Sequence, residues 1–282
     1  MTSYDGVVLE SIVETADTKT LVLDVGTHVS YRAGQYVSID PHQFLGLQSF
    51  VSYLENAKGR REAPRAYSMC SAPQEPYLAI TVKEEVYHAG KTLYPPLLSG
   101  FLVHNLRAGD PITVRGCAGA YVLPEDVESR AEHVLHVVAG SGSVPNLSMV
   151  KDSLCRHRRL RHTFLYSNRT WDDVIFRDEL GRMECANRDR LRVIHTLTRE
   201  PETTALPEGV RRGRITEQLL RGILEEEPTS LMYLCGSAVT VWDRRAHAAK
   251  GTTPPPQFLE GIKAHLAAIG VPPDRVKLEA YG

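Results

Sequence analysis

The first 125 residues contain short apolar runs, rich in β-branched residues and separated by turn residues. Runs of this length and spacing predict an antiparallel β-barrel or sandwich, and we expect the barrel. The runs are residues 5–15, 18–26, 34–40, 77–85 and 110–124. Residues 41–64 break the pattern, because their apolar residues recur at helical spacing. We expect an inserted helix near residues 42–56.

From about residue 132, short apolar strands alternate with amphipathic helices, which predicts an α/β domain with a parallel sheet. The predicted strands are residues 133–140, 162–168, 191–200, 230–236 and 275–282. The predicted helices are residues 143–157, 171–183, 215–224 and 256–270. The change of rhythm divides the chain into domains at residues 1–126 and 127–282.

The composition is that of an ordinary folded protein, with 42% hydrophobic and 24% charged residues among 282. A formal net charge of -1 gives no reason to expect nucleic acid or an anionic membrane as a partner. No apolar run is long enough to span a membrane, and the first residues lack a secretory signal. The five cysteines form no C-x-x-C pair and the 11 histidines no H-E-x-x-H motif. We therefore expect a cytoplasmic protein without a metal site or iron–sulfur cluster in this chain.

A glycine-rich turn, "VVAGSGSVPNLSM", opens the second domain. Gly140 and Gly142 allow a sharp turn and the close approach of a ligand. The helix that follows would direct its N-terminal amides at that ligand, which favours a phosphate. Pro145 fits the first turn of this helix, where no amide partner is needed. The alternative is a plain strand-to-helix turn, because G-x-G-x-x-P is not the usual dinucleotide fingerprint.

Three motifs in this order, "RAYS", "AGSGSVP" and "YLCGS", resemble those of the ferredoxin–NADP⁺ reductase family of flavoproteins. The resemblance covers nearly the whole chain and implies a flavin-binding barrel followed by a nicotinamide-dinucleotide domain. The stretch "YSNRTWDDVIFRDEL" is especially similar to reductases of ring-hydroxylating and ring-epoxidising oxygenases. The flavin segment with its long insertion resembles the reductase module of benzoyl-CoA epoxidase.

The resemblance implies a role for each residue of the flavin motif. Arg65 would contact a flavin phosphate, Tyr67 would stack on the isoalloxazine ring, and the Ser68 hydroxyl would approach N5. These roles fit the chemistry, since a guanidinium binds phosphate through forked hydrogen bonds and an aromatic face stacks on a flat ring. The further flavin-binding residues implied are Val82, Lys83, Ser99 and Gly100. Pro95 and Pro96 replace a glycine pair usual in relatives.

In the second domain, the resemblance places the dinucleotide pyrophosphate at Gly140, Ser141, Gly142 and Pro145. Cys235 and Gly236 match the family "CG", whose cysteine lies near the nicotinamide; the alternative for Cys235 is a small buried apolar residue. Tyr67, Ser68 and Cys235 would then be the catalytic residues. Tyr281 would either stack on the flavin or pack between domains. In oxygenase reductases the matching E-x-F-G precedes a ferredoxin domain, whereas this sequence stops there.

The coenzyme can be argued from the ends of the second and third strands. A free ribose 2′-hydroxyl is usually met by an acidic residue, whereas a 2′-phosphate needs cations and hydroxyls. The chain instead offers Asn168 and Arg169, then Thr198 and Arg199, followed by the arginine-rich residues 211–214. We expect NADPH rather than NADH.

The implied function is electron transfer from NADPH through FAD to a separate ferredoxin, iron–sulfur protein or oxygenase component. One alternative is a reductase of free flavin, ferric ions or quinones. Another is a non-catalytic flavin-binding subunit, although the intact "AGSGSVP" and "CGS" motifs favour catalysis.

Overall fold

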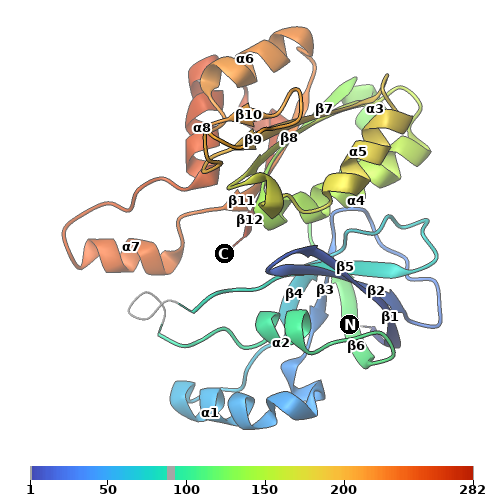
Figure 1. Ribbon diagram of the computed structural model, residues 1–282, viewed down its shortest axis with the longest axis vertical. Helices are drawn as coiled ribbons and strands as arrows, with labels where there is room; N and C mark the ends of the chain where they lie inside the picture. Colours follow the sequence, from blue (N-terminus) through green and yellow to red (C-terminus); the bar gives the residue numbers. More distant parts are fainter. Residues whose placement is uncertain (1, 88–92, 282) are drawn as a thin grey trace. The chain divides into compact units, whose positions relative to one another are not determined.

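The structure is a computed structural model that describes residues 2–87 and 93–281. The chain divides into two compact units, residues 1–122 with 147–152 and residues 123–146 with 153–282. Each unit contains one six-stranded sheet (Figure 1). None of the described helices combines the length and the hydropathy needed to cross a membrane.

The sheet of the first unit is antiparallel, with strand order β4-β3-β6-β1-β2-β5. Its strands are β1 (Ser3–Thr15), β2 (Thr18–Asp24), β3 (Tyr36–Ile39), β4 (Arg65–Ser68), β5 (Leu78–Lys83) and β6 (Pro111–Ala118). The two edges of the sheet meet where Met69, directly after β4, forms a bridge to Ile80 of β5. This bridge closes the sheet on itself and confirms the predicted barrel. Leu21, Leu23 and Ile80 are among the fully buried residues of its core.

The inserted segment contains the expected helix, but the helix begins later than the apolar pattern suggests. Two 3₁₀ turns, Pro41–Gln43 and Leu45–Leu47, precede α1 (Gln48–Lys58). The Asp40 side chain caps the first turn by accepting a hydrogen bond from the His42 amide. Phe44 is extended, with φ -96° and ψ 111°, and separates that turn from the second. A second short helix of this unit, α2 (Ser99–His104), precedes β6.

The sheet of the second unit is parallel, as predicted, with strand order β10-β9-β8-β7-β11-β12. Its strands are β7 (His133–Ala139), β8 (Arg161–Asn168), β9 (Leu191–Leu197), β10 (Arg211–Arg212), β11 (Leu231–Ser237) and β12 (Val276–Tyr281). The chain adds strands to one side of β7 and then returns to add β11 and β12 on the other. The order therefore reverses between β7 and β11, and open α/β sheets bind ligands at such a switch point.

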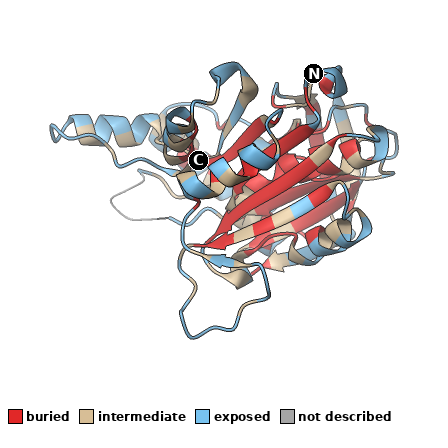
Figure 2. Cartoon of the chain, turned by 90° about the horizontal axis from the view of Figure 1, so that it is seen from above, coloured by how far each residue is buried: buried red, intermediate tan, exposed pale blue. Residues whose placement is uncertain are grey.

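Helices connect the strands of this sheet, and most of them bury apolar residues. They are α3 (Val127–Arg130), α4 (Ser143–Arg156), α5 (Arg177–Ala186), α6 (Glu217–Glu226), α7 (Val241–Ala248) and α8 (Phe258–Ile269). In α8 the buried residues Leu259, Ile262 and Leu266 recur at helical spacing and join the core of this unit. Figure 2 shows the resulting contrast between buried strands and helices with exposed outer faces.

Two helices of the second unit differ from the sequence prediction. The helix expected over residues 171–183 is interrupted, because Phe176 has a positive φ of 60° and α5 starts only at Arg177. Helix α7 was not expected, since "VWDRRAHA" has no apolar periodicity. Its N-terminus is defined by a capping box in which Thr240 and Asp243 exchange hydrogen bonds.

Candidate functional site

The predicted flavin motif forms the short strand β4, which pairs antiparallel with β3. Because side chains alternate along a strand, Arg65 and Tyr67 project to one side and Ser68 to the other. Tyr67 is half-buried and packs on the barrel core, and burial raises the pKa of its phenol. Its ring is therefore neutral and held by packing, as a stacking platform requires. Ser68 is buried.

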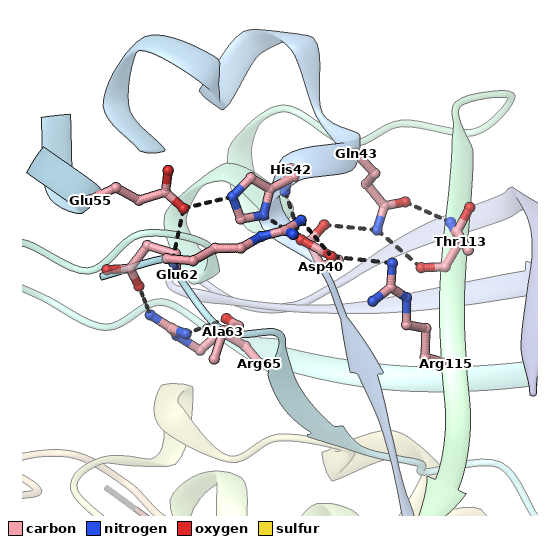
Figure 3. Close-up of polar contacts among 10 residues, drawn as sticks. Asp40, His42, Gln43, Glu55, Glu62, Ala63, Arg65, Thr113 and Arg115 are labelled. Carbon is pink, nitrogen blue, oxygen red and sulfur yellow. Dashed lines mark hydrogen bonds and ion pairs between the residues drawn. The ribbon is translucent and has the colours of Figure 1, made fainter. Parts of the chain in front are cut away.

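Arg65 is engaged by a buried carboxylate that the sequence motif did not indicate. Its Nη2 donates to Glu62 Oε2 at 2.5 Å, and its Nη1 donates to the Ala63 carbonyl oxygen (Figure 3). Lys58 Nζ donates to the other oxygen of Glu62 at 2.6 Å. Glu62 is only 5% exposed; burial alone would raise the pKa of its carboxyl, but the hydrogen bonds from Lys58 and Arg65 outweigh burial and lower it. The three side chains together retain one positive charge, which fits a phosphate ligand at Arg65.

A second set of charged residues links the inserted segment to this group. His42 lies between two carboxylates, with Nδ1 2.6 Å from Asp40 Oδ1 and Nε2 2.8 Å from Glu55 Oε1 (Figure 3). Hydrogen bonds to Asp40 and Glu55 raise the pKa of His42. Glu55 also accepts a hydrogen bond from the Glu62 amide at 2.9 Å. The insertion thus helps to position the carboxylate that holds Arg65. Sequence reasoning missed Glu62, although an acid three residues before an arginine is a recognisable spacing.

The other predicted flavin-binding residues differ in burial and in the partners that they already have. Val82 is 1% exposed and belongs to the barrel core, where it pairs with Lys19 of β2. Lys83 forms an ion pair with Asp17, Nζ to Oδ1 2.6 Å. Ser99 is buried, and its hydroxyl oxygen accepts a hydrogen bond from the Glu85 amide at 3.1 Å. A Cβ at Gly100 would lie 3.3 Å from a carboxylate oxygen of Glu84.

In the second unit, two motifs almost 100 residues apart are in direct contact. A Cβ added to Gly142 would lie less than 3.0 Å from backbone atoms of both Cys235 and Gly236. Only glycine permits this approach, because real Cβ atoms essentially never come that close. Gly140 has a positive φ of 51°, which also favours glycine. The turn lies at the switch point beside β7, where a dinucleotide is expected, and Pro145 lies in the first turn of α4.

Cys235 is fully buried, and desolvation raises the pKa of its thiol well above the ordinary value. A neutral thiol is a weak nucleophile, and this burial fits the alternative in which Cys235 is a small apolar core residue. It lies opposite Glu279 of β12, and burial raises the pKa of that carboxyl as well. Gly236 follows, where an added Cβ would meet the Phe258 ring. Tyr281, half-buried at the end of β12, pairs with Ser237 of β11.

The residues expected to choose the coenzyme lie at the carboxyl ends of two adjacent strands. Asn168 ends β8 and Thr198 follows β9, and the Thr198 hydroxyl donates to the Asn168 carbonyl oxygen at 3.1 Å. The Arg199 amide donates to the Arg169 carbonyl oxygen at 2.8 Å. Both guanidinium groups are exposed, and neither forms an ion pair with any residue that the structure describes. Two exposed arginines therefore follow the carboxyl ends of adjacent strands.

Comparisons with known proteins agree with this arrangement. Residues 137–241 match the oxidoreductase NAD-binding domain family. The chain is 25% identical to Flavohemoprotein A of Dictyostelium discoideum over 90% of its own length, and it spans 53% of that protein. The FAD/NAD-binding domain of nitric oxide dioxygenase from Vibrio cholerae O1 biovar El Tor superimposes with a TM-score of 0.68 at 21% identity, covering 99% of this chain and 98% of that one.

A ferredoxin reductase of carbazole 1,9a-dioxygenase superimposes over the whole of this chain and 70% of its own, with a TM-score of 0.68 at 18% identity. The chain has the ferredoxin reductase-like fold. The predicted resemblance to this class of flavoprotein is thereby confirmed, as are the barrel and the parallel α/β sheet. The narrower likeness to the benzoyl-CoA epoxidase reductase and the roles of individual residues stay predictions. Within the described residues, no group of three or more His, Cys, Asp or Glu side chains is arranged to hold a metal ion.

Proposed function

We propose that this protein is a flavoenzyme that takes electrons from NADPH and passes them to a separate ferredoxin, iron–sulfur protein or oxygenase component. The observation that carries the proposal is the contact between the glycine turn and the Cys235–Gly236 backbone at the switch point of the sheet. The oxidoreductase NAD-binding match spans this region, and a ferredoxin reductase shares the fold.

FAD would be held in the first unit by Arg65, Tyr67 and Ser68, with Ser99 and Gly100 near its phosphates. The cationic group of Lys58, Glu62 and Arg65 supports this assignment, since it keeps one positive charge for an anion. When bound, FAD accepts two electrons as a hydride and releases electrons one at a time to an acceptor. The protein binds and orients both cofactors, and the raised pKa of Cys235 keeps a neutral side chain at the dinucleotide turn.

Anaerobic titration tests this function. The purified protein, supplied with FAD, is expected to show a flavin absorption spectrum that NADPH bleaches, with reoxidation when a suitable ferredoxin is added. No flavin uptake from FAD or FMN would contradict the proposal. Bound flavin that neither NADPH nor NADH reduces would favour a non-catalytic subunit. Much faster turnover with free flavin, ferric ions or quinones than with any ferredoxin would favour a small-molecule reductase.

The two exposed arginines at the strand ends favour NADPH over NADH. A 2′-phosphate between Arg169 and Arg199 would gain charge-assisted hydrogen bonds, which are worth roughly 1.5–3 kcal/mol each. We therefore expect Arg199→Ala to raise the KM for NADPH by about tenfold or more and to leave NADH turnover within about twofold.

Arg192→Ala is the matched control for this substitution. Arg192 is an exposed arginine at the other end of β9, and it forms an ion pair with Glu226. Arg192→Ala should leave the KM values for NADPH and NADH unchanged. An equal loss with NADPH and NADH in Arg199→Ala would contradict the assignment.

The lack of disulfides among the five cysteines supports the cytoplasm as the proposed location. All five are free, and two of them, Cys155 and Cys185, are exposed. Exposed thiols persist most readily in a reducing compartment.

A further inference from the structure

Buried polar side chains lie directly beneath the glycine turn of the second unit. Tyr166 of β8 is fully buried, and its hydroxyl donates toward the Gly140 carbonyl oxygen and the Ser143 hydroxyl oxygen, each at 3.0 Å. Asn146, also fully buried, lies one turn into α4, and its Nδ2 donates to the Gly142 carbonyl oxygen at 3.1 Å. Two carbonyls of the turn are therefore held from the protein side.

The Asn146 amide is itself fixed by a chain of buried hydrogen bonds. Its Oδ1 accepts from His136 Nδ1 of β7 at 2.8 Å, so the neutral His136 ring offers Nε2 as an acceptor. His162 of β8 donates to it from Nδ1 at 3.1 Å. His162 Nε2 then accepts from the Ser153 hydroxyl of α4 at 2.8 Å. Every polar atom of the two rings is paired when both are neutral with the proton on Nδ1.

This series of hydrogen bonds attaches α4 to the sheet at two points on the same helix face. Asn146 and Ser153 are seven residues apart, and both reach histidines of the central strands. Burial lowers the pKa of His136 to about 4 and that of His162 well below its ordinary value. Both rings are therefore neutral near pH 7, as the hydrogen-bond pattern requires. Rotation or sliding of α4 would leave buried donors unpaired, which is costly.

The peptide geometry connects these bonds to ligand binding. A carbonyl and the following amide lie in one rigid plane, so holding the Gly140 oxygen fixes the direction of the Ser141 amide. Backbone amides of such turns are the groups that bind phosphate. The Gly142 oxygen, held by Asn146, similarly fixes the start of α4.

We propose that Tyr166 and Asn146 are positioning residues for the dinucleotide turn, and that the buried chain His136–His162–Ser153 orients the Asn146 amide for this task. The inference rests on the proposed function, because it assumes that a dinucleotide phosphate binds the turn. In this proposal, the polar residues beneath the turn contribute to the affinity for the dinucleotide as well as to the stability of the domain.

Tyr166→Phe is the decisive variant, since it removes one hydroxyl and keeps the ring that packs on Phe164. Thr163→Val is the matched control. It removes one buried hydroxyl from the same strand, but that hydroxyl bonds to His133 near the other end of the sheet. The FAD-loaded oxidised proteins are titrated calorimetrically with NADP⁺, and the thermal unfolding of each is recorded. Flavin reduction at saturating NADPH is measured in parallel.

We expect the Kd of NADP⁺ to rise about fivefold in Tyr166→Phe, the change that the loss of one neutral hydrogen bond corresponds to. Reduction at saturation should change less than twofold, and Thr163→Val should lose stability but keep its affinity within twofold. Asn146→Leu, if folded, should weaken binding further. Unchanged affinity in Tyr166→Phe, or an equal loss in Thr163→Val, would overturn the positioning role. If the unaltered protein binds neither NADP⁺ nor NAD⁺, the proposed function fails as well.

Discussion

Replacing Gly142 by alanine tests the contact on which the dinucleotide site depends. Gly142 has φ -63° and ψ -12°, which alanine adopts without strain. The obstacle is purely steric, because the new methyl group would lie closest to the Cys235 carbonyl oxygen, 2.6 Å from the Cys235 carbonyl carbon and 2.9 Å from the Gly236 nitrogen. Ordinary contact begins at 3.4 Å, so the turn or the strand must withdraw by more than about 0.8 Å to clear the carbonyl oxygen as well as the carbonyl carbon. None of these atoms belongs to a flexible side chain that could rotate away.

The cost of this withdrawal can be bounded. Overpacking a close-packed interior typically costs about 1–3 kcal/mol, and we expect the upper half of that range because the obstructing atoms are backbone. With a urea dependence of about 2 kcal/mol/M, the unfolding midpoint of the second unit should fall by about 1 M or slightly more. Dinucleotide affinity should also fall, since the turn that receives the phosphate is the element displaced.

Tryptophan fluorescence during urea unfolding reports on the second unit, which contains Gly142. The chain has only two tryptophans, Trp171 and Trp242, and both belong to the second unit. Gly181→Ala is the matched control, because a Cβ at Gly181 in α5 meets nothing within 4 Å. It should stabilise the unit by about 0.5–1 kcal/mol through helix propensity. A Gly142→Ala protein with an unchanged midpoint and unchanged dinucleotide affinity would refute the reasoning.

Two further predictions concern acid stability and flavin binding. Burial lowers the pKa of His133, His136 and His195 to about 4, against 6.5 ordinarily, so the unfolded state takes up more protons between these values. The second unit should therefore lose stability as the pH falls from about 6.5 to about 4. Its fluorescence-monitored unfolding should show this loss, with a smaller pH slope in His195→Gln than in a control substitution of the exposed His28, and equal slopes would contradict it. In the first unit, Arg65→Ala should weaken FAD binding by at least tenfold in a fluorescence-quenching titration, whereas Arg61→Ala, which removes a largely exposed arginine, should not. Equal FAD affinity in both variants would remove Arg65 from the flavin site.

Local patterns were sufficient to predict much of the architecture. Alternation with a period of two and amphipathic helical spacing depend only on neighbours in the chain, so they revealed the barrel, the parallel sheet and the change between them. They failed where a local exception intervened, as at Phe176, whose positive φ breaks a helix that the apolar residues favoured. They also missed α7, which is defined by a capping box and not by an apolar face.

For the candidate site, too, some features were recognisable in sequence and others depend on the tertiary structure. "RAYS", "AGSGSVP" and "YLCGS" were recognisable in sequence, because each combines residue types with a particular chemistry at a short spacing. The spacing of Glu62 and Arg65 was recognisable in sequence, but the burial of Glu62 and the hydrogen bond from its amide to Glu55 depend on how the insertion returns to β4. Sequence also could not show that Lys83 is paired with Asp17, 66 residues away.

By itself, then, the sequence determined the two sheet types, their order along the chain and the three motifs, because each of these can be recognised within short stretches of sequence. Only the tertiary structure decided that Gly142 must be glycine, because the reason lies in the backbone of Cys235 on another strand. The same holds for Tyr166, Asn146 and the two buried histidines, which look like ordinary core positions in the sequence. Their hydrogen bonds connect separate strands and a helix, and such contacts exist only once the parallel strands are placed side by side.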